Sequence, residues 1–117
     1  MIDHDASHNS KMIISSQYAY FFEDLAKSQR GRTLRIEKGG DLRTAELSGE
    51  QVVLEGLKYS HSSKGETVTV STNEPDQPEF RIEFMLVWAV FDREENVVAV
   101  ALSDQHNRKV VLRFEST

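Results

Sequence analysis

The chain contains no cysteine among its 117 residues. This absence excludes disulfide bonds, thiol catalysis and thiolate metal sites. No apolar run approaches the roughly 18 to 20 residues that a helix needs to span a bilayer. The first residues also lack the basic and apolar regions of a signal peptide, so we expect a cytoplasmic protein.

Positive charge is the minority charge, because 14 Lys and Arg residues stand against 19 Asp and Glu residues, for a net charge of −5. A general nucleic-acid binder needs a basic stripe, and anionic membranes attract basic segments. We therefore expect neither nucleic acid nor a membrane as a partner. The length suits one domain, which we place at residues 12–117, and the polar residues 1–11 are expected to form a flexible tail.

An amphipathic helix is predicted over Gln17–Arg30. Its apolar residues recur at the i, i+3, i+4, i+7 spacing of a single helical stripe. Ser15 or Ser16 could cap its N-terminus, and Gly31 is placed to end it. This is the one convincing helix in the sequence, and its stripe consists of Tyr18, Phe21, Phe22 and Leu25.

After Gly31 the sequence is a series of strands and turns. A change of parity across Glu55-Gly56 predicts a β-bulge, and Gly39-Gly40 is a plausible hairpin connection. Short connections force neighbouring strands to pair antiparallel. The expected strands are Thr33–Lys38, Leu42–Leu47, Val52–Tyr59, Thr67–Thr72, a strand from Phe80 into the run Phe84–Phe91, Val97–Leu102 and Val110–Phe114.

These elements predict an α+β fold. One N-terminal helix would pack on a strongly curled, mostly antiparallel sheet of about six to eight strands, either a partly open barrel or two layers. The run Phe84–Phe91 has no polar residue, so we expect both of its faces to be covered. We also expect it to pair with Val97–Leu102 across the turn at Asp92–Asn96.

One helix cannot cover both faces of the apolar run, so its second face must be buried by the sheet or by another subunit. Trp88, in the middle of the run, is then either a core residue or an interface anchor. We expect a subunit contact at one end of the run and core at the other. The candidate interface residues are Met85, Val87, Trp88 and Phe91.

Basic residues cluster at positions 27–43, where they are interleaved with acidic residues that could neutralise them. The cluster is either a solvated, salt-bridged face or a site for an anionic ligand. For the second case we expect a pocket between helix and sheet, with Arg35, Arg43 or Tyr59 at its mouth. The cluster consists of Lys27, Arg30, Arg32, Arg35, Lys38 and Arg43.

Catalytic and metal-binding patterns are weak. His4 and His8 have the spacing of a metal pair but stand in the polar tail, and His61 and His106 fall in predicted turns. Ser103, Asp104 and His106 are neighbours in one turn, whereas the members of a catalytic triad normally come from separate elements. We therefore expect no catalytic residues, no metal site and no cofactor.

The order of features resembles a family of small bacterial proteins that is defined only as a domain of unknown function. The similarity covers about residues 15–115. It implies a bacterial source and an α+β fold, and it brings no known catalytic residues. The residues that support it are Tyr18-x-x-Phe21-Phe22-x-x-Leu25, Gly31, Thr33–Glu37, Leu54-x-Gly56-Leu57-x-Tyr59, Val68, Val70 and Val111-Leu112-x-Phe114.

Two functions of different classes remain open from the sequence. The first is a non-catalytic interaction or assembly module, expected to form a homodimer through the Phe84–Phe91 and Val97–Leu102 strands. The second is a small-molecule or anion-binding domain with a pocket between the helix and the sheet. An enzyme is the less favoured reading, because no nucleophile and base can be paired.

Overall fold

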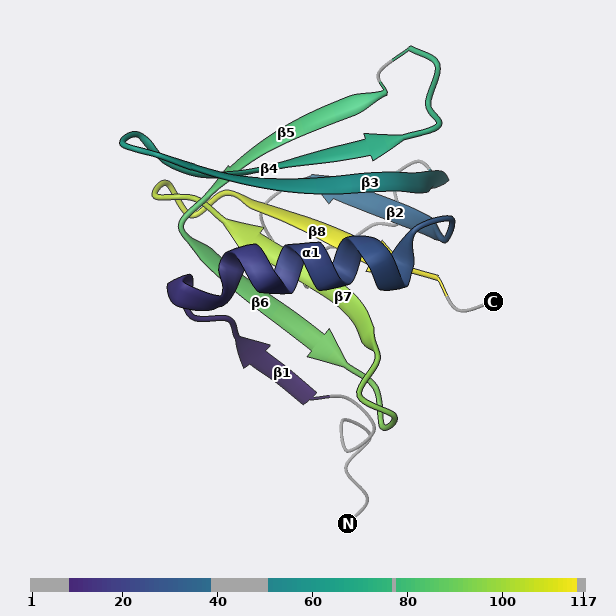
Figure 1. Ribbon diagram of the computed structural model, residues 1–117, viewed down its shortest axis with the longest axis horizontal. Helices are drawn as coiled ribbons and strands as arrows, with labels where there is room; N and C mark the ends of the chain where they lie inside the picture. Colours follow the sequence, from purple (N-terminus) through teal and green to yellow (C-terminus); the bar gives the residue numbers. More distant parts are fainter. Residues whose placement is uncertain (1–8, 39–50, 77, 116–117) are drawn as a thin grey trace.

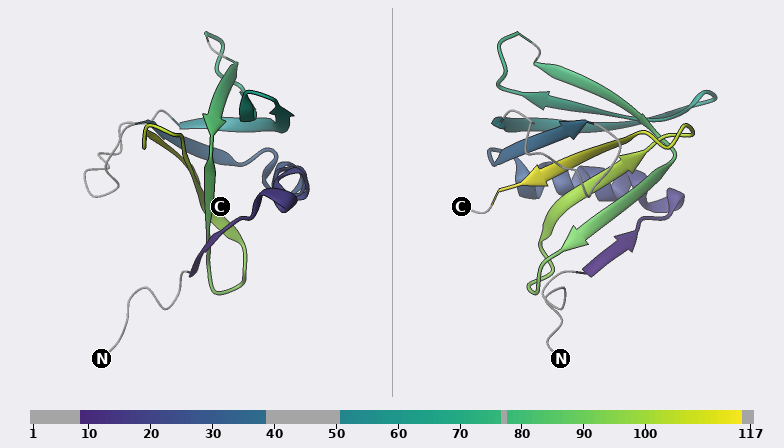
Figure 2. Two further views of the ribbon diagram at one scale, coloured as in Figure 1. Left: turned by 90° about the vertical axis from the view of Figure 1, so that its left-hand side faces the viewer. Right: turned by 180° about the vertical axis from the view of Figure 1, so that it is seen from behind.

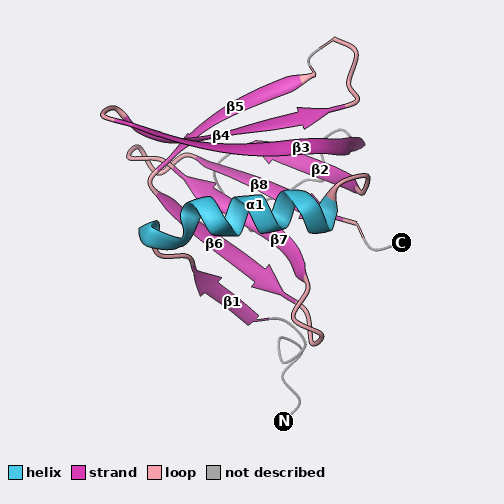
Figure 3. Cartoon of the chain, viewed as in Figure 1, coloured by secondary structure: helices cyan, strands magenta, loops and turns pink. Residues whose placement is uncertain are grey.

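The computed structural model describes residues 9–38, 51–76 and 78–115, and Figure 1 shows their arrangement. One α-helix lies against a sheet of eight strands in this part of the chain (Figure 3). The elements in order are β1 (Asn9–Met12), the 3-10 turn η2 (Ser15–Gln17), α1 (Tyr18–Gln29), β2 (Thr33–Lys38), β3 (Gln51–Ser62), β4 (Gly65–Thr72), β5 (Glu79–Phe84), β6 (Leu86–Phe91), β7 (Val97–Ser103) and β8 (Lys109–Phe114).

The strands form one antiparallel sheet in the order β1-β6-β7-β8-β2-β3-β4-β5. Every pairing between them is antiparallel, as the short connections predict. Among the described residues β1 and β5 are the two edge strands, so the sheet does not close into a barrel. The α+β class is confirmed, whereas the strong curl expected from the sequence is not supported.

Helix α1 lies along one face of the sheet, which the two further views in Figure 2 make clear. Its predicted stripe faces the core: Tyr18, Phe22 and Leu25 are at most 4% exposed. Gly31 ends the helix with φ of 87°, a left-handed conformation that glycine adopts without strain. The predicted serine cap is wrong, because the N-cap residue is Gln17 and no side chain caps the first turn.

Strand β3 contains the predicted bulge, where the register shifts between Leu54 and Gly56. Before it, Val52 and Leu54 face the helix side of the sheet, and after it Leu57 and Tyr59 do so. The extra residue therefore keeps apolar side chains of both parities in one core. It also lets one strand pair with β2 through its first residues and with β4 through the rest.

The apolar run Phe84–Phe91 is not one covered strand. Phe84 ends β5, the chain turns at Met85, and β6 begins at Leu86. The Met85 N–H donates to the Ser103 carbonyl at 2.7 Å, which ties this corner to the end of β7. Within one chain the second face of β6 is exposed at Leu86 and Trp88, so of the two covers expected from the sequence only a second subunit stays a prediction, whereas the predicted pairing of β6 with β7 is confirmed.

The N-terminal end of the described chain is a strand rather than a tail. We expected a tail at residues 1–11, but Asn9–Met12 form β1, which pairs with β6. The Gly39-Gly40 hairpin and the strand Leu42–Leu47 lie outside the described residues. No helix within the described ranges is long and apolar enough to cross a membrane.

The core predicts a large cost for truncating Phe22, which is fully buried against Tyr59 and Phe84. Phe22→Ala should lower the free energy of unfolding by about 3–5 kcal/mol, because it removes apolar contacts and leaves a cavity. Tyr20 on the same helix is 75% exposed, so Tyr20→Ala should change stability by about 0.5 kcal/mol or less. Urea unfolding of both variants checks this, and equal losses would contradict the assignment of the helix faces.

Candidate functional site

Three large apolar side chains lie exposed together on the face of the sheet opposite α1, which we call the outer face. Met12 is 49% exposed, Leu86 44% and Trp88 41%. Met12 on β1 stands directly beside Trp88 on β6 in the strand register, and Leu86 points to the same face because it is two residues before Trp88. These three residues form the outer patch.

The outer patch continues across the sheet over small residues. Trp88 is in register with Ala101 on β7, and Ala101 with Val111 on β8. The exposed row runs from Met12 through Trp88 to Ala101 and so spans about 10 Å at the usual strand spacing, because Val111 is only 5% exposed. Because the Ala101 side chain is short, the surface beside the Trp88 ring is apolar and lies lower than the ring. A contiguous apolar surface of this kind is typical of a binding face.

Strand β1 adds a second feature to the same place. All four of its residues are exposed, and it is an edge strand of the described sheet. The backbone N–H and C=O groups on its outer side have no strand partner among the described residues. An exposed edge of this kind is a template for another strand. The outer patch therefore lies beside an edge that can extend the sheet.

Ion pairs lie on the outer face next to the apolar row. Arg113 Nε donates to Glu37 Oε2 at 2.6 Å, and Arg35 Nη2 lies 3.5 Å from Glu115 Oε1. Gln51 also donates to Glu115, at 2.6 Å. A depression of about 540 Å³ lies here, and Arg35, Val90, Val98, Ala99, Arg113, Phe114 and Glu115 line it.

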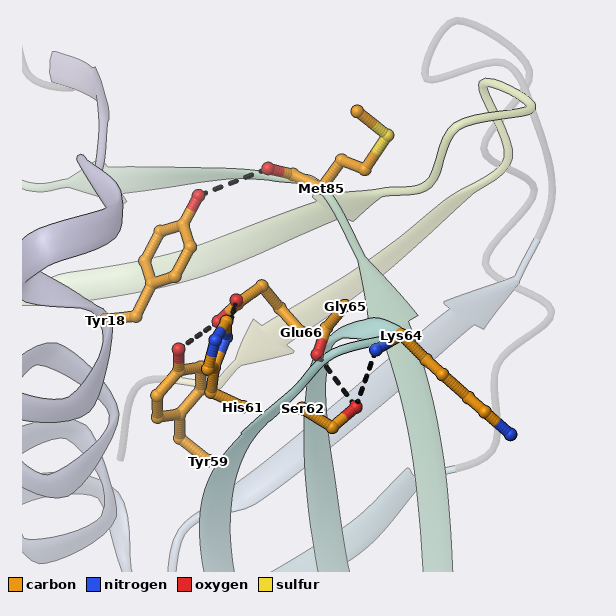
Figure 4. Close-up of polar contacts among 8 residues, drawn as sticks. All are labelled: Tyr18, Tyr59, His61, Ser62, Lys64, Gly65, Glu66 and Met85. Atoms are coloured by element: carbon orange, nitrogen blue, oxygen red, sulfur yellow. Dashed lines mark hydrogen bonds and ion pairs between the residues drawn. The ribbon is translucent and has the colours of Figure 1, made fainter.

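Tyr59 lies in a polar and aromatic cluster on the helix side of the sheet (Figure 4). Its hydroxyl donates to the Glu66 carboxylate, which His61 Nδ1 also contacts, and the Tyr18 hydroxyl donates to the Met85 carbonyl at 3.2 Å. The Tyr59 ring packs edge-on against Tyr18 with centroids 5.9 Å apart. The cluster thus joins the helix, the β3–β4 hairpin and the corner at Met85.

The protonation of this cluster follows from its contacts. Burial, the hydrogen bond to Glu66 and the negative charge of Glu66 raise the pKa of Tyr59 to about 12. Burial acts to raise the pKa of Glu66, but the hydrogen bonds from Tyr59 and His61 and the charge of His61 together outweigh it, so this pKa lies below its ordinary value. At neutral pH the hydroxyl is therefore the donor and the carboxylate the acceptor.

The structure does not bring the predicted ligand residues together. Arg35 is in register with Gln51, and Tyr59 lies eight residues farther along β3, which corresponds to about 26 Å. The two side chains also lie on opposite faces of the sheet. Arg43 lies outside the described residues.

The four predicted interface residues differ in their surroundings. Trp88 belongs to the outer patch, but Val87 is fully buried and cannot contact a partner. Met85 is 57% exposed at the corner between β5 and β6, and the Phe91 ring is half-buried with Lys11 Nζ 5.5 Å from its centroid. Met12 and Leu86 were not among the candidate interface residues predicted from the sequence. Met12-Ile13-Ile14, an apolar triplet before the helix, was the available signal.

The polar turn at 103–108 is a structural unit. The Asp104 carboxylate accepts the backbone N–H groups of His106 and Arg108, both at 2.9 Å, and Arg108 Nε at 2.8 Å. These bonds account for a lowered Asp104 pKa. The described residues contain no group of His, Asp and Glu side chains that could hold a metal ion, and His4 and His8 lie outside them.

The Tyr59–Glu66 bond predicts a stability loss at alkaline pH. Because the folded-state pKa of Tyr59 is raised from 10.0 to about 12, its contribution is fully present below pH 10 and is lost as the pH rises through about 12. Tyr59→Phe should remove this part of the pH dependence and leave the ring packing intact. The difference in phenolate absorbance between the wild type and the variant, recorded against pH, measures the titration of the Tyr59 hydroxyl. A difference titration at the ordinary tyrosine value would contradict the bond.

Comparison with known proteins gives no family from which a function could be transferred. No family model, no curated protein and no solved structure matches this chain. The resemblance to a small bacterial family therefore gains no support. The functional argument rests on the exposed side chains and their geometry.

Proposed function

We propose that this protein is a non-catalytic interaction module that self-associates through the outer patch. The observation that supports this is the exposure of Met12, Leu86 and Trp88 side by side on one sheet face. Exposing this much apolar surface in one place is unfavourable in water, and burying it in an interface reverses that cost. Tryptophan and methionine are also enriched at protein interfaces, and buried tryptophans are frequent binding hot spots.

A second copy of the chain is the occupant that the geometry favours. A two-fold axis places an edge strand antiparallel to its own copy, so β1 can pair with β1 of another protomer. Edge pairing alone would leave both outer patches exposed on one face, so the patches become buried only when two protomers pack face to face, patch against patch, across a two-fold axis. The short length of β1, 4 residues, means that the apolar contacts would have to supply much of the binding energy.

The charges on the outer face are compatible with a like copy. The chain has a net charge of −5, which opposes self-association at long range. On the outer face, however, Glu37 is paired with Arg113 and Glu115 with Arg35. The surface that would meet a second protomer is therefore close to neutral, and salt at physiological strength screens the remaining repulsion. A homodimer in the cytoplasm of a bacterial cell is the form of this proposal that the sequence favours.

An alternative function is the binding of a small organic molecule in the depression beside Arg35. Its volume of about 540 Å³ falls within the range of small-molecule sites. Apolar residues form part of its lining and two guanidinium groups stand at it, which would suit a small carboxylic acid. Benzoate should then raise the melting temperature of the wild type more than that of Arg113→Gln, and equal shifts would argue against this function.

The proposed function predicts that Trp88→Glu yields a folded monomer. A buried, unpaired carboxylate at the interface would be strongly unfavourable, whereas Trp88 in the free protomer is 41% exposed and can be replaced without a core cavity. Light scattering with size exclusion should give twice the chain mass of 13.3 kDa for the wild type and the single mass for the variant.

The matched control is Tyr20→Glu, which places the same charge at an aromatic position that is 75% exposed on α1. This variant should dimerise as the wild type does. A wild-type protein that stays monomeric at high micromolar concentration, or a Trp88→Glu variant that dimerises normally, would contradict the proposal. Circular dichroism of each variant establishes that the fold is kept.

A further inference from the structure

A groove of about 290 Å³ lies at the corner where β5 passes into β6, and Met85, the residue before Leu86 of the outer patch, is part of its lining. Residues of the β3–β4 turn, of β4 and β5, and of the β7–β8 turn line it. The hydrogen bond from Met85 N–H to the Ser103 carbonyl holds the β7–β8 turn against this corner. The groove is thus formed by segments that are distant in the sequence and fixed by the sheet.

Two hydroxyl side chains, those of Ser62 and Thr67, line the groove, and the sheet face that leads to it is polar. On the face of β3, β4 and β5 opposite α1, Lys58 is in register with Thr69 and Thr69 with Arg81. The next row toward the groove contains Ser60, Thr67 and Glu83. Ser62 follows at the turn, where its hydroxyl accepts the Lys64 backbone N–H at 3.2 Å, as Figure 4 shows. These rows contain no apolar side chain.

The groove has as many acidic as basic side chains, with Lys64, Arg81 and Arg108 against Glu66, Glu83 and Asp104, but two of the basic side chains have no ion pair among the described residues. Lys64 and Arg81 form no ion pair within the described part of the chain, and Arg108 uses only its Nε for Asp104. Of the acidic residues at the groove, Asp104 already accepts three hydrogen bonds, and Glu66 is engaged by Tyr59 and His61. Glu83 is then the one carboxylate left to oppose Lys64 and Arg81.

We propose that this groove binds a phosphate group, either as free phosphate or on a small phosphate ester. Arginine and lysine with serine and threonine hydroxyls are the donors that phosphate oxygens take in proteins. The guanidinium of Arg81 and the free Nη groups of Arg108 can each donate two bonds, and the Thr67 hydroxyl can donate from the sheet wall, whereas the Ser62 hydroxyl already donates to the Gly65 carbonyl. The volume suits a phosphate with a small substituent rather than a long polymer. The site is independent of the outer patch, so either proposal can fail without the other.

The test is a titration with inorganic phosphate at constant ionic strength, followed by the amide resonances of the labelled protein. Saturable shifts should be confined to Lys64, Arg81 and the turn Asp104–Arg108. Arg81→Gln should weaken binding roughly tenfold or more, since it removes charge-assisted hydrogen bonds. Glu83→Gln should tighten it, because a like charge leaves the groove. Both side chains are exposed, so the fold should survive both changes.

Arg93→Gln is the matched control, because Arg93 is an exposed arginine in the β6–β7 turn, outside the groove. It should bind phosphate as the wild type does. Shifts that do not saturate, that chloride reproduces, or that Arg81→Gln and Arg93→Gln weaken equally would overturn the proposal. Phenyl phosphate then distinguishes the sources: tighter binding than inorganic phosphate indicates an ester, and equal binding indicates the free ion.

Discussion

The packing of one short helix on a wide sheet is the constraint on which the rest of the structure depends. Helix α1 has 12 residues and is therefore about 18 Å long, whereas eight strands extend over about 34 Å. Its stripe of Tyr18, Phe22 and Leu25 closes a core on one face of the sheet. On the other face Val111 and Ala99 are buried, but the side chains on β1 and β6 are exposed, and these must be compatible with water or meet a partner.

The outer face meets this requirement in two different ways. On β3, β4 and β5 it displays hydroxyl and charged side chains, which water solvates well and which converge on the corner groove. On β1 and β6 it displays Met12, Leu86 and Trp88 instead, beside a free strand edge. The same sheet therefore offers an apolar surface on β1 and β6 and a polar groove at the corner where β5 passes into β6. Two distinct kinds of binding can follow from the same sheet.

Local patterns in the sequence predicted the elements whose form is set locally. The helical stripe, the end at Gly31, the bulge at Gly56 and the alternating strands all depend on neighbours in the chain. The break at Met85 was not predictable in this way, because it depends on the distant carbonyl of Ser103. Strand β1 was missed because Asn9 and Ser10 are polar and only β6 makes them a strand. For the site, composition singled out Trp88. Which residues of β6 face outward, and that Val87 is buried, became clear only from the register of β6 with its neighbours.

The central claim is that the uncovered apolar surface at Trp88 is an interface between copies of this chain. Because this is the only tryptophan in the sequence, its fluorescence reports on the outer patch directly. Emission spectra recorded as the protein is diluted from high micromolar to nanomolar concentration are the most direct measurement. The account predicts a blue-shifted emission at high concentration that moves to the red as protomers separate, along a curve that matches the mass from light scattering. An emission maximum that stays constant over the whole range, at a mass of one chain, would contradict it.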